Sequence, residues 1–120
     1  LRNAIKDNDY KYYISRRIHR LICRAKTSKI PVDIDINYMI ELWEQQTGRC
    51  YYSSIEMNGS GTDRATASWN SPSVDRLNPS LGYIKGNVAW CIYAVNSFKG
   101  ELTELEFTKI TSIIKWKPTT

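Results

Sequence analysis

The N-terminal segment carries the most regular pattern of hydrophobic and polar positions in the chain. Apolar residues recur every three or four positions, and basic residues take most of the positions between them. This spacing predicts an amphipathic helix within residues 1–30. Its apolar positions are Tyr13, Ile14, Ile18, Leu21, Ile22 and Ala25. The stretch from Ser28 to Pro31 ends the helix, because proline disfavours helical backbone in the residue before it.

Two further helices are marked by residues that favour a helix start or stop. Asp35 is a good N-cap residue, and Gly48 is a natural stop for the helix that follows it. Thr103 and Glu106 have the spacing of a capping box, in which the two side chains satisfy backbone amides at a helix start. A C-terminal helix is therefore expected between Thr103 and Pro118. Its expected apolar face consists of Phe107, Ile110, Ile113 and Ile114.

The middle of the chain has shorter patterns, which predict strands separated by turns. The expected ranges are 49–52 and 66–69 for two short strands, 58–63 for a loop between them, 73–77 and 83–89 for two later strands, 78–82 for their turn and 90–99 for a helix. The fold class that follows is α+β. We expect a basic helical arm at residues 1–30 and a core at residues 31–120, within one compact domain.

Charge is distributed unevenly along this predicted fold. The chain of 120 residues has 17 Lys and Arg against 12 Asp and Glu, a net charge of +5. Residues 1–30 hold nine of the bases and two of the acids, a net charge of +7, which leaves −2 for residues 31–120. A basic arm on a near-neutral body indicates a polyanionic partner, although a solvated helix face is the simpler alternative. The candidate phosphate contacts on one helical side are Arg16, Arg17, Arg20 and Arg24.

Composition excludes several classes of protein. The chain is 42% hydrophobic and 24% charged, which is ordinary for a globular protein and unlike collagen or a disordered chain. No apolar run approaches the roughly 20 residues of a membrane helix, and no signal peptide is visible, so we expect a cytoplasmic protein. Three cysteines are too few for a disulfide framework. Cys23, Cys50 and Cys91 are expected to be buried free thiols.

Two oxygen-bearing side chains in the strand–turn–strand–helix segment could bind a hard cation. Asp75 lies on the first predicted strand and Asn96 on the predicted helix. Mg²⁺ takes one or two oxygen ligands from a protein and leaves the others to water and phosphate. From residue types alone, a carboxylate in an ordinary salt bridge is the more common situation.

The same segment resembles the ββα-metal core of HNH endonucleases, in the branch common among phage-encoded and mobile nucleases. The matching motifs are Cys50-Tyr51-Tyr52-Ser53, Ser73-Val74-Asp75-Arg76-Leu77-Asn78, Gly82-Tyr83, Gly86-Asn87-Val88 and Asn96-Ser97-Phe98-Lys99. The match covers residues 48–107, about half of the chain, and the order and spacing agree throughout.

The resemblance implies a role for each matching residue. Asp75 corresponds to the strand carboxylate that binds the metal, and Asn96 to the helix residue that completes the protein ligands. Asn87 corresponds to an asparagine that braces the loop between the strands. Lys99, one turn after Asn96, would face a phosphate, and Lys85 is a further candidate for DNA contact. The implied cofactor is one divalent cation, Mg²⁺ or Mn²⁺, which stabilises charge on the phosphate and the leaving oxygen.

The chain departs from the family pattern at the cysteines. Zinc-bearing members use two Cys-x-x-Cys pairs, whereas here the corresponding pairs are Cys50 with Ser53 and Cys91 with Ala94. Two thiols cannot close a tetrahedral zinc site. We therefore expect no structural zinc, and Cys50 and Cys91 as neighbours in the core. For the aromatic residues Tyr51, Tyr52, Trp69 and Trp90, packing is a better interpretation than base stacking.

The second departure is Arg76, which stands where the wider family has the histidine that deprotonates the attacking water. A guanidinium stays protonated and cannot be a general base. Arg76 is therefore expected to hold the phosphate or orient the water. The proton would then go to Tyr83, to a water relay or to a carboxylate.

The leading interpretation is a metal-dependent DNA endonuclease or nickase that leaves 5′-phosphate and 3′-hydroxyl ends on double-stranded DNA. One site per chain means that cutting both strands needs a homodimer or two successive nicks. The first alternative is a DNA-binding module on an inactive fold of the same kind, which Arg76 favours. The second is an RNA-directed protein, because a basic arm suits RNA as well as DNA.

Overall fold

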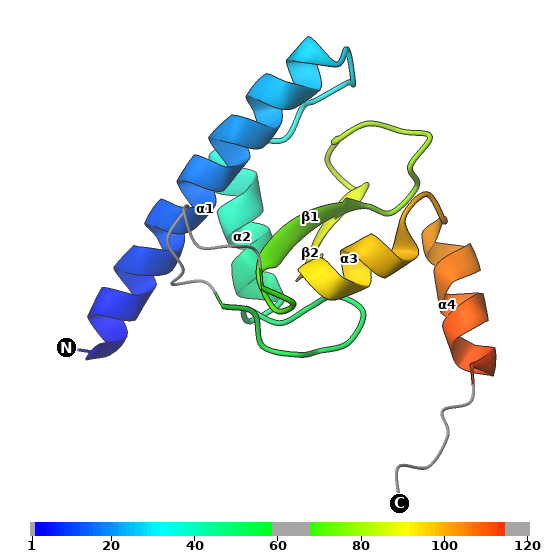
Figure 1. Ribbon diagram of the computed structural model, residues 1–120. Coiled ribbons are helices and arrows are strands. Elements are labelled where there is room, and N and C mark those ends of the chain that lie inside the picture. Colours follow the sequence, from blue (N-terminus) through cyan, green and yellow to red (C-terminus); the bar gives the residue numbers. More distant parts are fainter. Residues whose placement is uncertain (1, 59–67, 115–120) are drawn as a thin grey trace, which may run out of the picture.

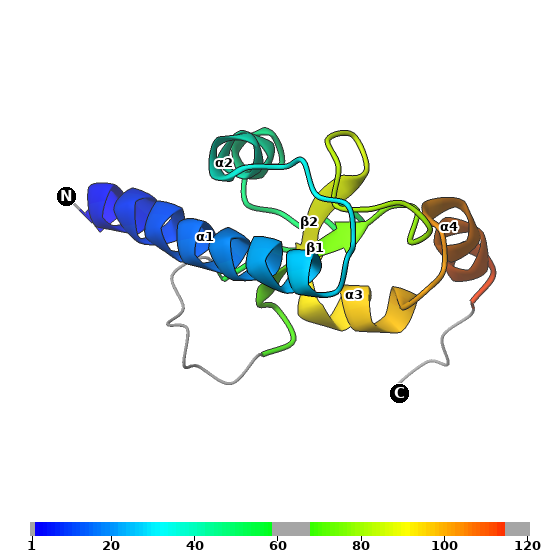
Figure 2. The same cartoon turned by 90° about the horizontal axis from the view of Figure 1, so that it is seen from above.

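The computed structural model describes residues 2–58 and 68–114, with side chains from Tyr10 onward. Within these ranges the fold is α+β, with four helices and one two-stranded antiparallel sheet. In chain order the elements are α1 (Arg2–Thr27), α2 (Ile36–Gln45), β1 (Pro72–Arg76), β2 (Val88–Ile92), α3 (Tyr93–Lys99) and α4 (Glu104–Ile113). The β1–β2 hairpin lies between α2 and α3, with α1 along one flank (Figures 1 and 2). Over the described ranges, none of the helices has the length and apolar character needed to cross a membrane.

The predicted N-terminal helix forms, and one of its faces belongs to the hydrophobic core. Ile14 and Ile18 are fully buried. They pack in one cluster with Met39 and Trp43 of α2 and with Trp90 of β2. The apolar stripe that predicted the helix is thus the stripe that anchors it. The basic residues of α1 are left on its other sides.

Both predicted helix starts are confirmed. The Asp35 carboxylate accepts a hydrogen bond of 2.8 Å from the amide of Tyr38 at the start of α2. At the start of α4 the Thr103 hydroxyl accepts from the Glu106 amide at 3.1 Å. The Glu106 carboxylate accepts from the Thr103 amide at 2.9 Å. These contacts satisfy amides that have no partner within the helix itself.

Of the two later strands, only the second differs clearly from the prediction. β1 agrees with it closely, but β2 begins at Val88 instead of residue 83, and α3 begins at Tyr93 instead of residue 90. Residues 90–92 stay in the sheet because they pair with residues 72–74, in the register Val74 with Trp90 and Ser73 with Cys91. All five residues of β2 are buried, so both faces of this strand are covered by the rest of the protein.

Residues 83–87 lie in the loop of the hairpin and not in β2, because Tyr83 forms its backbone hydrogen bonds with the segment before α2. The Tyr83 amide donates to the Pro31 carbonyl at 2.9 Å, and the Asp33 amide donates to the Tyr83 carbonyl at 3.1 Å. Gly82 permits this close approach, since a Cβ atom there would lie 2.1 Å from the Pro31 oxygen. The loop between the strands is thereby tied to the segment that joins α1 to α2.

The expected strand at 49–52 is a tight turn. Two of its hydrogen bonds are local: the Cys50 amide donates to the Ile55 carbonyl, and the Ser54 amide to the Cys50 carbonyl, each at 2.9 Å. The Tyr51 amide instead donates to the Trp90 carbonyl of β2 at 2.9 Å. Only an isolated bridge joins Arg49 and Glu56. Of the expected strand at 66–69, residues 68 and 69 do not form a strand, and the other two lie outside the described residues. Most of the expected loop at 58–63 also lies outside them.

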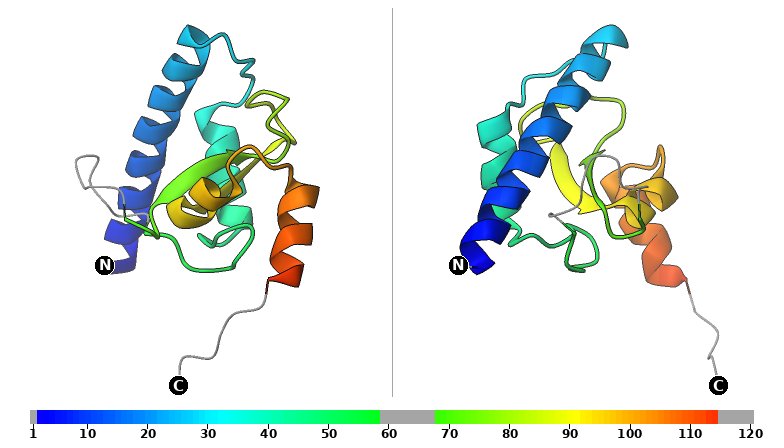
Figure 3. Two further views of the ribbon diagram at one scale, coloured as in Figure 1. Left: turned by 45° about the vertical axis from the view of Figure 1, so that its right-hand side comes forward. Right: turned by 60° about the vertical axis from the view of Figure 1, so that its left-hand side comes forward.

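Helix α4 lies on the far side of the hairpin from α1 (Figure 3). Of the expected apolar face only Phe107 is buried, and its ring contacts the rings of Tyr52 and Phe98 at centroid distances of 5.0 and 5.7 Å. Ile110 and Ile113 are 37% and 72% exposed, so most of the expected apolar face is not covered by the described part of the protein. The helix is therefore held by its first turn and by one aromatic cluster.

Candidate functional site

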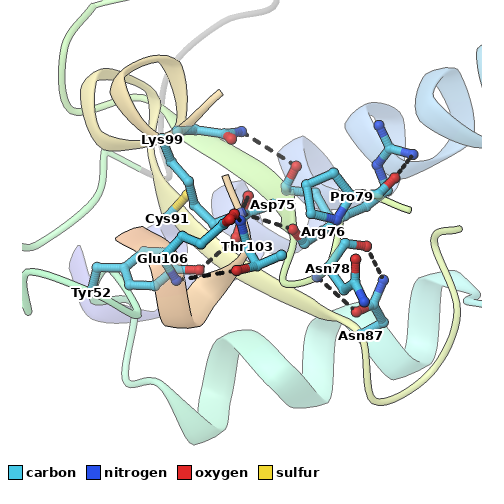
Figure 4. A network of polar contacts seen from close by, with 12 residues as sticks. Tyr52, Asp75, Arg76, Asn78, Pro79, Asn87, Cys91, Lys99, Thr103 and Glu106 are labelled. Atoms are coloured by element: carbon cyan, nitrogen blue, oxygen red, sulfur yellow. Dashed lines mark hydrogen bonds and ion pairs between the residues drawn. The ribbon is translucent and has the colours of Figure 1, made fainter. Parts of the chain in front are cut away.

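Asp75 occupies the centre of a buried polar network between β1 and α3 (Figure 4). Its carboxylate is 3% exposed. The Lys99 ammonium lies 3.1 Å from Asp75 Oδ1, and the Tyr52 hydroxyl donates to Oδ2 at 2.8 Å. Lys99 also donates to the carbonyl of Arg76 at 3.0 Å. Both oxygens of the expected metal ligand thus contact donors from the protein itself.

This network shifts the pKa values of Asp75 and Tyr52. Burial raises the pKa of the Asp75 carboxyl, against the opposing effects of the Tyr52 and Lys99 hydrogen bonds. Burial also raises the pKa of the Tyr52 phenol, and the neighbouring Asp75 carboxylate raises it further. Tyr52 therefore stays protonated at neutral pH and acts as a hydrogen-bond donor to the carboxylate. A general base is not available from this phenol.

Asn96 lies on the same side of the hairpin as Asp75. Its amide nitrogen donates to the Ser73 hydroxyl at 3.0 Å and to the Val74 carbonyl at 3.4 Å. Ser73 and Asp75 are two positions apart on β1, so their side chains share the face that α3 covers. The Asn96 Oδ1 oxygen, the atom that could bind a cation, accepts no hydrogen bond from the residues that the structure describes.

Arg76 has a structural task on the loop after β1. Its guanidinium donates to the carbonyls of Pro79 and Leu81 at 3.1 and 3.3 Å. The guanidinium carbon also lies 5.2 Å from the centre of the Tyr83 ring. As the neighbour of Asp75 on a strand, Arg76 points toward the other face of the hairpin. The structure thus brings Arg76 and Tyr83 together, in a brace around residues 79–83.

Asn87 closes the same loop from its other end. Its Oδ1 accepts from the Asn78 amide at 3.0 Å, and its Nδ2 donates to the carbonyls of Asn78 and Gly82 at 3.1 and 2.9 Å. Because Asn87 is 6% exposed, these contacts replace those that water would make. The side chain holds the turn in the position that the resemblance implies for a bracing asparagine.

Two lysines expected at DNA lie in different environments. Lys99 is 1% exposed and paired with Asp75, so it does not face a surface phosphate in this structure. The prediction of a phosphate contact did not take into account that Lys99, three positions after Asn96, lies on the same face of α3 and so also faces the hairpin. Lys85 is exposed, and its ammonium lies 5.7 Å from the centre of the Tyr38 ring.

The arginines of α1 form a basic surface on the side away from the core. Arg20 and Arg24 are exposed, whereas Arg16 and Arg17 are half-buried and lie over the rings of Tyr12 and Tyr13. A hollow of about 390 Å³ opens along this side. Its described lining consists of Tyr13, Arg17, His19, Arg20, Cys23 and Arg24. Three of the four expected arginines thus line one concave surface.

The cysteines form no metal cluster in the part of the chain that the structure describes. Cys50 and Cys91 are buried neighbours, as expected, and their hydrogen bond lowers the pKa of Cys50 to about 5. The same contact and burial raise the pKa of Cys91. Cys23 is exposed, which corrects the expectation that all three thiols are buried. It lies 3.9 Å from His19 on the outer side of α1.

Sequence reasoning missed two partners of Asp75. Tyr52 was assigned to core packing, although its hydroxyl reaches the carboxylate from a turn 23 positions earlier in the chain. For Lys99 the motif implies a contact with a DNA phosphate, although this residue follows Asn96 on a helix that covers β1. The one available signal was the spacing of Asn96 and Lys99, which puts both side chains on neighbouring positions of one helix face.

Comparison with known proteins identifies no relative of this chain. No protein-family model, no curated protein and no solved structure matches the chain. The resemblance to HNH endonucleases therefore rests on its sequence motifs, and the structure adds a two-stranded antiparallel hairpin packed against a helix.

Proposed function

We propose that this chain is a metal-dependent DNA endonuclease or nickase, with its site on the β1–β2–α3 element. The observation that carries the proposal is the placement of Asp75 and Asn96. One comes from the strand and the other from the helix packed on it, and both lie on the same side of the hairpin. This is the strand–strand–helix order and ligand placement that the ββα-metal motifs imply.

The chemistry of the donor atoms fits a hard divalent cation. A carboxylate and a carboxamide oxygen are ligands that Mg²⁺ and Mn²⁺ accept, and the Lys99 ammonium marks the Asp75 carboxylate as a place for positive charge. Asp75 and Asn96 would hold the ion. When bound, a divalent cation stabilises the negative charge that develops on a phosphate during hydrolysis.

The remaining residues have supporting tasks. Arg76 and Asn87 hold the loop between the strands through four bonds to backbone carbonyls and one from a backbone amide. A rigid loop keeps β1 and its carboxylate in register with β2, from which α3 continues. The basic surface of α1 supplies sequence-independent affinity for a duplex, because each contact with a phosphate releases bound counterions.

Cleavage of supercoiled plasmid DNA tests this function. The wild-type protein is expected to nick or linearise the plasmid with Mg²⁺ or Mn²⁺ and to be inactive in EDTA. The matched variant replaces Asp75→Asn together with Lys99→Met, which removes the carboxylate and its counter-ion as a neutral pair. We expect this variant to keep the DNA affinity that the arginines of α1 supply and to cleave none of the DNA. Wild-type cleavage by the variant would show that the site lies elsewhere.

A second candidate is a DNA-binding protein that does not cleave. The observation that favours it is the closure of Asp75 by Lys99 and Tyr52, together with the use of Arg76 as a brace. In that case DNA binding follows the arginines of α1, and no divalent metal changes the plasmid. Retained binding without cleavage in any metal would select this candidate.

A further inference from the structure

We propose that Lys99 is a built-in counter-ion that competes with a divalent cation for Asp75. This inference rests on the proposed function, because it concerns the same carboxylate. In this reading the protein alternates between a closed state, with the ammonium on Asp75, and an open state, in which Asp75 can take a metal. Lys99 then controls metal affinity without being a metal ligand.

The contacts of Asp75 show why the two cations exclude each other. Lys99 approaches Oδ1 at 3.1 Å and is itself 1% exposed. A divalent cation on the same carboxylate would stand within a few Å of the ammonium, in surroundings where charges are poorly screened. Like charges at that distance repel strongly, so one of them has to leave.

The Tyr52 hydroxyl makes Asp75 a site for one cation at a time. It donates to Oδ2 at 2.8 Å, so a donor from the protein already occupies the second oxygen. The Lys99 side chain is able to leave because it ends α3, immediately before Gly100. Its flexible four-carbon stem can carry the ammonium outward.

Release of Lys99 links metal binding to DNA binding. A phosphate beside α3 stabilises the released ammonium, and a metal stabilises the vacated carboxylate. Both ligands therefore favour the open state, and each raises the affinity of the other by the same factor. The phosphate contact that the motif implies for Lys99 would belong to this open state alone.

Terbium binding tests the competition without any measurement of cleavage. Tb³⁺ is a hard cation that prefers oxygen ligands, and nearby Tyr rings sensitise its luminescence. We expect Lys99→Met to bind Tb³⁺ about tenfold or more tightly than the wild type, as in other couplings between two sites. Lys85→Met removes an exposed ammonium and serves as the matched control, with wild-type affinity. Asp75→Asn combined with Lys99→Met is expected to lose the gain.

The outcomes separate this inference from the proposed function. Equal Tb³⁺ affinity in the wild type and Lys99→Met would overturn the competition and leave the endonuclease untouched. A gain that survives the loss of Asp75 would also overturn it. Failure of wild-type plasmid cleavage, in contrast, concerns the function alone.

A second variant guards against misfolding. Lys99→Gln keeps a donor for the Arg76 carbonyl and removes only the charge. If circular dichroism shows that Lys99→Met is unfolded, Lys99→Gln is expected to show the same rise in Tb³⁺ affinity. Wild-type affinity in the folded Gln variant would refute the competition.

Discussion

The protein has two groups of charges, one buried at Asp75 and one exposed on α1, and they differ in how strongly water and salt screen them. Asp75 and Lys99 are shielded from water, so each charge depends on the other and on Tyr52. Arg20 and Arg24 are exposed, so salt screens their interactions strongly. The buried pair therefore bears on the stability of the fold and, under the proposals above, on metal binding, whereas the exposed arginines bear on the proposed affinity for DNA.

Breaking the buried pair is the sharpest test of this contrast. Lys99→Met leaves a carboxylate without its counter-ion, and we expect a loss of about 3–5 kcal/mol in the free energy of unfolding. Replacing Asp75→Asn together with Lys99→Met removes both charges and should recover most of that loss. Urea denaturation at pH 7 measures both variants. If the single and double variants are equally stable, the pair does not behave as a buried one.

Arg76 stands between the two regions, because it is half-buried and braces a loop. In a working nuclease, Arg76→Ala is expected to slow cleavage by about 10², the typical cost of a small misplacement of reacting groups, because the loop between the strands loses two hydrogen bonds and a ring contact. Arg76 points to the face of the hairpin away from Asp75, so Arg76→His should not gain a pH dependence near 6–7, the ordinary range of histidine. The measurement is the pH–rate profile of plasmid cleavage. A new pKa in that range for Arg76→His would contradict the bracing role and place position 76 at the reacting phosphate.

The exposed arginines should affect salt dependence and leave the fold intact. A double variant with Arg20→Ala and Arg24→Ala is expected to lower the slope of the logarithm of the DNA-binding constant against the logarithm of the salt concentration by about two, if both side chains contact phosphate. The control pair Lys11→Ala with Lys26→Ala removes the same charge from another side of α1 and should change the slope less. Fluorescence anisotropy of labelled duplex DNA at several salt concentrations gives the slopes. Equal slopes for both pairs would place the DNA elsewhere.

The capping box of α4 offers the smallest effect, and one that depends on pH. Thr103→Ala is expected to cost about 1 kcal/mol of stability, the usual loss for a capping hydroxyl. Hydrogen bonds from the Thr103 amide and hydroxyl lower the pKa of Glu106. The contribution of the Glu106 carboxylate to stability is therefore complete above the ordinary pKa of a glutamate. It disappears as the pH falls through the lower pKa that Glu106 has in the folded protein.

A comparison of unfolding at pH 7 and at acid pH checks the sign of that effect. The wild type should lose the capping contribution at low pH, and Glu106→Gln should lack it at both. A Gln variant with the full pH dependence of the wild type would assign the effect to other carboxyls.

Local sequence signals were sufficient where a structure depends on near neighbours. The stripe through Ile14 and Ile18, the N-cap at Asp35 and the box at Thr103 all act within a few residues. The order strand, turn, strand and helix was also predictable from residues 73–99. The bounds of these elements were not predictable, because hydrogen bonds of Tyr83 with the Pro31 carbonyl and the Asp33 amide decide where the second strand begins.

The candidate site divides in the same way. From its resemblance to the HNH motifs, the sequence predicts Asp75 and Asn96 as oxygen ligands and Asn87 as a loop brace, and the chemistry of a guanidinium excludes Arg76 as a base. The structure shows the bracing contacts of Asn87. Only the tertiary structure brought Tyr52 and Lys99 to the two oxygens of Asp75. The reason is that burial and pairing depend on contacts between residues more than 20 positions apart, and local spacing carries no information about which charge meets which.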